Sequence, residues 1–217
     1  ILKLYLKMKN RICNFFYKFG SLFKLKLKFS LPPKKKIVVF DEHTYDNLKY
    51  VIDDYDYFVL KDRFDFHNII YFHPFVISKF LKNFKLKNIW STYLISLIEI
   101  INPRVVLTFT DNSFRFFEAS QELGFKINFF AVQNGARYDF NKFKFRLNKG
   151  IIKEDFTKRY FIPNFFCFGD FEKQDYQKNK INVQNFYPVG SLRLSNFLFE
   201  KKKEYLTTHK KKYDILL

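Results

Sequence analysis

The stretch Arg104-Val-Val-Leu-Thr-Phe-Thr110, followed by Asp111-Asn112-Ser113, decides how this chain is expected to fold. β-Branched and bulky apolar residues fill it almost without interruption, which is typical of a strand that is buried on both faces. The polar triplet leads into a helix predicted over Ser113–Leu123, which Gly124 is expected to end as a C-cap. A buried strand, a polar turn and a helix in this order indicate one unit of an α/β sheet.

The same alternation of strand and helix continues on both sides of this stretch. Five further apolar runs predict strands, at Ile37–Phe40, Tyr57–Leu60, Lys126–Val132, Phe165–Phe168 and Val183–Val189. Four further segments predict helices, at Thr44–Ile52, His67–Phe84, Asn88–Ile101 and Phe171–Gln177. Tyr138–Pro163 has no clear period and predicts a long loop. We therefore expect an α/β fold: an open, mainly parallel Rossmann-like sheet with helices on both faces.

The first 33 residues form a basic, aromatic and amphipathic arm that Pro32-Pro33 ends. Residues 1–36 hold eleven Lys and Arg and no Asp or Glu, out of a net charge of +18 for the whole chain. Residues 1–30 therefore suit an anionic membrane surface; the alternatives are a disordered tail or a helix packed on the domain. Residues 34–206 are expected to form the Rossmann-like domain, and 207–217 a linker and the first strand of a second, truncated domain.

Several classes of site have no support in the sequence. Cys13 and Cys167 share no metal-binding spacing and the four His are scattered, so no metal site is predicted. Neither a glycine-rich dinucleotide motif nor a phosphate-binding P-loop is present, and no cofactor is predicted. No apolar run is long enough to span a bilayer, and lysines interrupt every stretch that could act as a signal peptide. A cytoplasmic protein, peripheral at the inner face of the membrane, is expected.

Polar residues follow the predicted strands, where open α/β sheets bind their ligands. Asp111 and Asp41 are the candidate general bases, although either could be purely structural. The candidate substrate-binding residues are Asn112, Ser113, Gln133, Asn134, Gly135, Arg137, Gly190, Ser191 and Arg193. Each group has a plainer alternative: a helix cap at 111–113, a tight turn at 133–135, a solvated arginine at 137, and a strand exit at 190–193.

Four blocks in this order resemble a known family: Val106–Ser113, Ala131–Arg137, Phe166–Gly169 and Tyr187–Arg193. They look like the blocks of bacterial surface-carbohydrate (lipopolysaccharide or capsule) biosynthesis proteins, which are similar to GT-B glycosyltransferases and CDP-glycerol-type polymer transferases. The resemblance implies the N-terminal Rossmann-like domain of a transferase.

In such a transferase the acceptor would bind to this domain and the donor mostly to a C-terminal one. A nucleotide-activated sugar or polyol would be the donor and a glycan the acceptor, and this fragment alone is expected to be inactive. Asp111, Asn112, Gln133, Asn134, Gly135 and Gly190 would line the cleft between the domains.

A second hypothesis is a non-catalytic protein that binds a membrane surface through the basic arm. Nucleic acid is a weaker partner for it, because residues 37–217 carry 28 basic and 21 acidic side chains and no recognised nucleic-acid motif.

Overall fold

A computed structural model describes residues 26–42, 45–62, 69–84, 88–135 and 159–208. Six strands form one parallel sheet in the order β3-β2-β5-β6-β7-β8. Their bounds are β2 Ile37–Phe40, β3 Tyr57–Leu60, β5 Val105–Thr108, β6 Asn128–Val132, β7 Ile162–Cys167 and β8 Val183–Pro188. The predicted open, parallel α/β sheet is confirmed.

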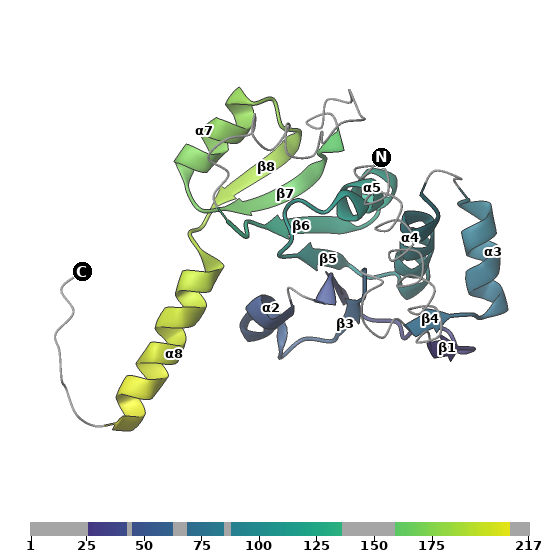
Figure 1. Cartoon of the computed structure of the whole chain (residues 1–217), viewed down its shortest axis with the longest axis horizontal. Helices are drawn as coiled ribbons and strands as arrows, with labels where there is room; N and C mark the ends of the chain where they lie inside the picture. Colours follow the sequence, from purple (N-terminus) through teal and green to yellow (C-terminus); the bar gives the residue numbers. More distant parts are fainter. Residues whose placement is uncertain (1–25, 43–44, 63–68, 85–87, 136–158, 209–217) are drawn as a thin grey trace, which may run out of the picture.

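Helices cover both faces of the sheet, as predicted (Figure 1). On one side of it, α4 (Ile89–Ile101), α5 (Phe114–Leu123) and α7 (Asp170–Lys178) enclose the larger core. On the other side, α2 (Tyr45–Ile52) and the first turn of α8 (Leu192–Thr208) cover a smaller core. This division follows from topology. The chain moves from β2 to β3 in one direction and from β5 to β8 in the other, so right-handed crossovers place α2 opposite α5 and α7.

A prediction of helix over residues 67–84 is wrong for its first part. Ile69–Tyr71 forms a strand, β4, which pairs in parallel with β1 (Lys26–Lys28) in a separate two-stranded sheet. The helix α3 begins only at Pro74 and runs to Lys82, because a residue before proline is restricted to extended backbone. His73 caps it: its Nδ1 accepts a hydrogen bond of 3.1 Å from the Phe75 amide.

The small sheet is attached to the rest of the domain through β4. The Tyr71 amide donates a hydrogen bond of 2.7 Å to the hydroxyl oxygen of Tyr93, on α4. Burial raises the pKa of Tyr93 to about 12, so this hydroxyl stays neutral at physiological pH. In Figure 1 the sheet lies at the opposite side of the molecule from α8, which extends away from the large sheet.

The six predicted strands of the large sheet and the other predicted helices are confirmed to within a few residues at their ends, whereas α8 was not predicted. Most of the loop predicted over Tyr138–Pro163 and of the segment 207–217 lies outside the described residues. Gly124 ends α5 as predicted, and a Cβ atom at this position would lie 2.4 Å from the Ser120 carbonyl oxygen. Only glycine fits so close an approach. Within the described part of the arm, Lys26–Leu31 are all exposed and the first buried residue is Pro32.

Candidate functional site

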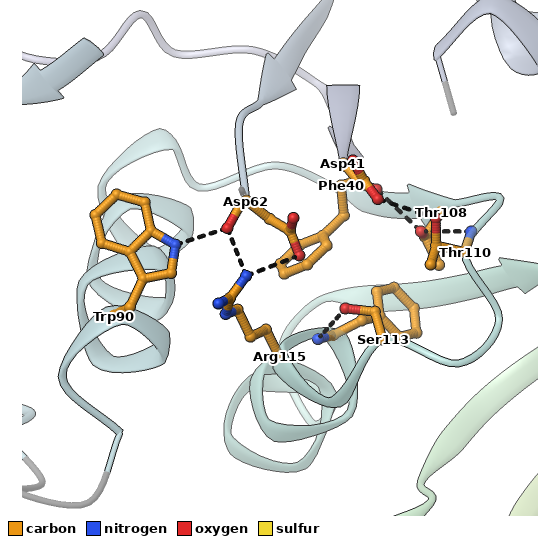
Figure 2. Close-up of polar contacts among 9 residues, drawn as sticks. Phe40, Asp41, Asp62, Trp90, Thr108, Thr110, Ser113 and Arg115 are labelled. Atoms are coloured by element: carbon orange, nitrogen blue, oxygen red, sulfur yellow. Dashed lines mark hydrogen bonds and ion pairs between the residues drawn. The ribbon is translucent and has the colours of Figure 1, made fainter. Parts of the chain in front are cut away.

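The carboxyl ends of β2 and β5 meet where the strand order changes direction, which is the usual ligand position in a doubly wound sheet. Asp41 follows β2 and is 1% exposed. Thr110, beyond β5, donates a hydrogen bond of 3.0 Å from Oγ1 to the Asp41 Oδ2, and Thr108 donates one of 2.9 Å to the Phe40 carbonyl oxygen (Figure 2). These bonds fix the two strand ends to each other.

The backbone of Asp41 has a φ of 86°, a left-handed value that non-glycine residues seldom adopt. We expect Asp41→Ala to be less stable than Asp41→Gly by about 1 kcal/mol, because both lose the bond to Thr110 but only glycine relieves the backbone. Urea unfolding of the two variants and the unmodified chain measures this difference. An alanine variant as stable as the glycine variant would show that the conformation carries no cost.

Asp62 follows β3 and brings a second buried carboxylate to the same edge, where it is 4% exposed. Its carbonyl oxygen accepts hydrogen bonds from Trp90 Nε1 at 2.7 Å and from an Arg115 guanidinium nitrogen at 2.6 Å. The same nitrogen lies 3.6 Å from the Asp62 Oδ2. Figure 2 shows Arg115 reaching from the start of α5 toward β3, so this residue joins the first helical turn to a neighbouring strand end.

Asp111, one of the two candidate bases, is completely buried. Its Oδ2 accepts a hydrogen bond of 3.4 Å from the hydroxyl of Tyr176 on α7. Asp41 and Asp111 are therefore both shielded from solvent, and a substrate hydroxyl could reach either carboxylate only if the surrounding chain moved. Their role as bases stays a prediction.

Gln133 is also completely buried, and both ends of its amide are occupied. Its Oε1 accepts a hydrogen bond of 2.9 Å from the Phe168 amide, and its Nε2 donates one of 3.1 Å to the Gly135 carbonyl oxygen. The side chain thus joins the end of β6 to the end of β7. The geometry gives Gln133 a structural role in holding the edge, in addition to any role in ligand binding.

The connection from β8 to α8 contains the last group of predicted site residues, Gly190, Ser191 and Arg193, at the carboxyl edge of the sheet. Gly190 has a φ of 88°, so the turn there requires a left-handed backbone. Ser191 caps α8, because its Oγ accepts a hydrogen bond of 3.4 Å from the Leu194 amide. The Arg193 guanidinium carbon lies 5.3 Å from the centre of the Phe109 ring, which places a positive group beside the end of β5.

The remaining predicted residues differ in accessibility. Ser113 is the N-cap of α5 and accepts a hydrogen bond of 3.4 Å from the Phe116 amide, while Asn112 beside it is half-buried. Asn134 and Gly135 are half-buried too. Gly135 has no left-handed backbone and open space around its Cα, so the structure does not require glycine there. Arg137 lies outside the described residues.

An uncharged aromatic and amide surface lies on the α2 side of β6, β7 and β8. The rings of Phe130 and Phe166 stack at 5.5 Å, and those of Phe166 and Tyr187 lie 5.3 Å apart. Asn164 accepts hydrogen bonds of 3.2 Å from Asn185 Nδ2 and from the Tyr187 hydroxyl. We call these five residues the aromatic–amide face. Tyr187 is 39% exposed, and the three rings approach the carboxyl edge of the sheet.

A cavity of about 270 Å³ lies elsewhere, between the ends of α3 and α5 and the side of α4. Asn83 and Glu99 line it and are joined by a hydrogen bond of 2.6 Å. Since the end of α5 leads into the start of β6, this cavity is near the amino ends of the strands. It does not belong to the predicted site.

No family model, curated protein or solved structure matches this chain. Among the residues that the structure describes, no group of three or more His, Cys, Asp or Glu side chains could hold a metal ion. No helix in the described ranges is both long and apolar enough to cross a bilayer.

Sequence reasoning missed Asp62, Arg115 and Tyr176 at this edge. Asp62 lies two residues beyond a correctly predicted strand, so its position was a usable signal. Arg115 and Tyr176 lie within helices, and only the three-dimensional structure shows that their side chains turn toward the strand ends.

Proposed function

We propose that this domain forms the acceptor side of a transferase that extends a bacterial surface glycan. One observation carries the proposal: the ends of the parallel strands converge at the point where the strand order reverses, and two arginines accompany them. Open α/β sheets place ligands there, and fixed positive groups suit the phosphates of an activated donor. The order of the four sequence blocks that resemble surface-carbohydrate transferases points the same way.

In the proposed reaction, an acceptor hydroxyl oxygen bonds to the transferred group while the bond from that group to the donor phosphate breaks. The hydroxyl proton passes to a base, and the nucleotide leaves with its negative charge. Arg115, whose side chain is 39% exposed, and the exposed Arg193 are the described cations suited to that phosphate. Asp111 or Asp41 would take the proton once movement of the surrounding chain exposed its carboxylate. The donor would lie mainly on a second domain.

The aromatic–amide face favours a glycan as the acceptor. Sugar rings present C–H groups that pack on an exposed ring such as that of Tyr187. The Nδ2 groups of Asn164 and Asn185 donate to backbone carbonyl oxygens, so sugar hydroxyls would pair with the amide oxygens. Its five residues carry no charge, whereas a single-stranded nucleic acid is bound by aromatic rings combined with a positively charged groove. A neutral sugar chain therefore matches this surface better than nucleic acid does.

The test of the proposal measures both binding and transfer. We expect Asn112→Ala and Tyr187→Ala each to weaken binding of neutral oligosaccharides, and transfer from nucleotide sugars or CDP-polyols, by about tenfold, or ~1.4 kcal/mol. Calorimetric titration of the purified chain gives the binding constant, and product analysis with the chain joined to the proposed donor domain gives the transfer rate.

Tyr55→Ala is the matched control, because Tyr55 is 62% exposed and precedes β3 at the opposite edge of the sheet. This variant should bind and react like the unmodified chain. If no oligosaccharide or activated sugar binds, or if all three variants behave alike, the assignment of the edge and the aromatic–amide face is wrong.

A further inference from the structure

We infer that β1, β4 and the start of α3 form a docking surface for an anionic lipid bilayer. Five large apolar side chains are exposed there: Leu27 at 52%, Phe29 at 68%, Leu31 at 44%, Phe72 at 49% and Phe75 at 52%. We call them, with the exposed Lys26, Lys28 and Lys34, the basic apolar patch; Lys26 and Lys28 alternate with Leu27 along β1, so they leave the strand on its other face. The inference is independent of the proposed transfer activity.

The apolar members of the patch come from distant parts of the chain and meet in space. The Phe72 amide donates a hydrogen bond of 2.7 Å to the Lys28 carbonyl oxygen, which extends the pairing of β1 with β4. The rings of Phe29 and Phe72 lie edge to face at 6.2 Å. Phe75 follows in the first turn of α3. Exposed apolar clusters of this kind mark surfaces that bind a partner or a membrane.

The positive charge of this region favours an anionic membrane over the other kinds of partner. Residues 26–40 and 69–84, which contain the patch, include seven lysines and no Asp or Glu, and two of these lysines, Lys35 and Lys79, pair with acidic residues from elsewhere in the chain. Lysines near an anionic leaflet are attracted to its headgroups, while apolar side chains enter the boundary between headgroups and acyl chains. A second copy of this chain would present the same positive charge, so the patch does not complement itself.

The patch lies on a part of the domain that can approach a flat surface. Figure 1 shows β1 and β4 side by side at one end of the molecule, with α3 rising from β4. The bond between Tyr71 and Tyr93 holds β4 to α4, so the patch belongs to the folded domain and extends the membrane surface predicted for residues 1–30.

The test uses the full chain with vesicles of phosphatidylcholine alone and of phosphatidylcholine mixed with phosphatidylglycerol. We expect binding to the mixed vesicles only, and weaker binding when the salt is raised from about 0.1 M to about 0.5 M. Phe72→Ser/Phe75→Ser and Lys26→Gln/Lys28→Gln should each reduce the partition coefficient by about tenfold or more. Co-sedimentation measures the bound fraction, and circular dichroism confirms that the variants are folded.

Phe125→Ser/Phe171→Ser is the matched control, because these rings are 76% and 69% exposed and lie outside the patch, one in the turn after α5 and one on α7. It should bind vesicles like the unmodified chain. Equal binding to both kinds of vesicle, or equal binding by the Phe72/Phe75 and control variants, would overturn the inference; the latter result would assign binding to residues outside the patch. Two other results would also overturn it, if the unmodified chain does not bind vesicles. One is a dimer in sedimentation velocity, and the other is a complex with RNA in a gel shift, in each case lost in the patch variants.

Discussion

Gln133→Glu should destabilise the domain by about 3 kcal/mol or more at pH 7.5 and by much less near pH 4. The native amide accepts from the Phe168 amide and donates to the Gly135 carbonyl oxygen, and the side chain is completely buried. A neutral carboxyl group can replace both bonds, since it has one acceptor oxygen and one hydroxyl donor. An ionised carboxylate cannot donate, and its charge would be buried.

The sign of the pH dependence follows from this burial. Desolvation should raise the pKa of the new carboxyl group in the folded state above its unfolded value of about 4.3. The variant therefore approaches the unmodified chain below that value and loses stability as the pH rises through the folded pKa. The measurement is the difference in free energy of unfolding between the two proteins at each pH, which removes the titration of all other groups.

Gln184→Glu provides the control, because Gln184 is an exposed residue of β8. It should change stability by no more than about 0.5 kcal/mol across the same pH range. If Gln133→Glu were equally mild at pH 7.5, the position would be accessible to water and its role in holding β6 to β7 would be refuted. The result also separates structure from function, because a destabilised variant cannot report on ligand binding.

The sheet could be predicted because its strands are short apolar runs between polar turns. Residues such as Val38 and Val106 are completely buried between two helical layers, so burial on both faces left a continuous apolar signal in the sequence. The strand β4 was not predicted, because Ile69–Tyr71 is only three residues long and a helix begins soon after it. The His73-Pro74 pair was the available sign that the helix starts later.

The position of the site could be predicted from the sequence, but the burial and hydrogen bonding of its side chains could not. Parallel strands bring their carboxyl ends to one edge, so Asp41, Asp111 and Gln133 follow from strand prediction alone. Their burial depends on partners such as Thr110, Tyr176 and Phe168, which come from other strands or helices. The order of the strands in the sheet could not be predicted from the sequence either. The sequence therefore did not show that β2 lies beside β5.

Arg115→Met should destabilise the domain by about 2 kcal/mol, because the buried Asp62 would lose its bonds to the guanidinium, although water partly screens the Arg115 side chain, which is 39% exposed. The Arg115 guanidinium lies 3.6 Å from the Asp62 carboxylate, whose side chain is 5% exposed, and also donates to the Asp62 carbonyl oxygen. Methionine retains the apolar stem but removes the charge and the donors. Asp62→Asn should restore part of the loss in the double variant, because a neutral amide costs less to bury than a carboxylate.

Arg159 offers a control with the same ion-pair separation, and its guanidinium carbon also lies 4.3 Å from the centre of the Phe114 ring. Its guanidinium lies 3.6 Å from the Glu118 carboxylate, whose side chain is 23% exposed. Water screens this pair, so Arg159→Met should cost no more than about 1 kcal/mol. Denaturant unfolding of both single variants and of the double-mutant cycle gives the comparison. Equal costs at the two arginines would mean that burial of Asp62 does not strengthen its pairing with Arg115.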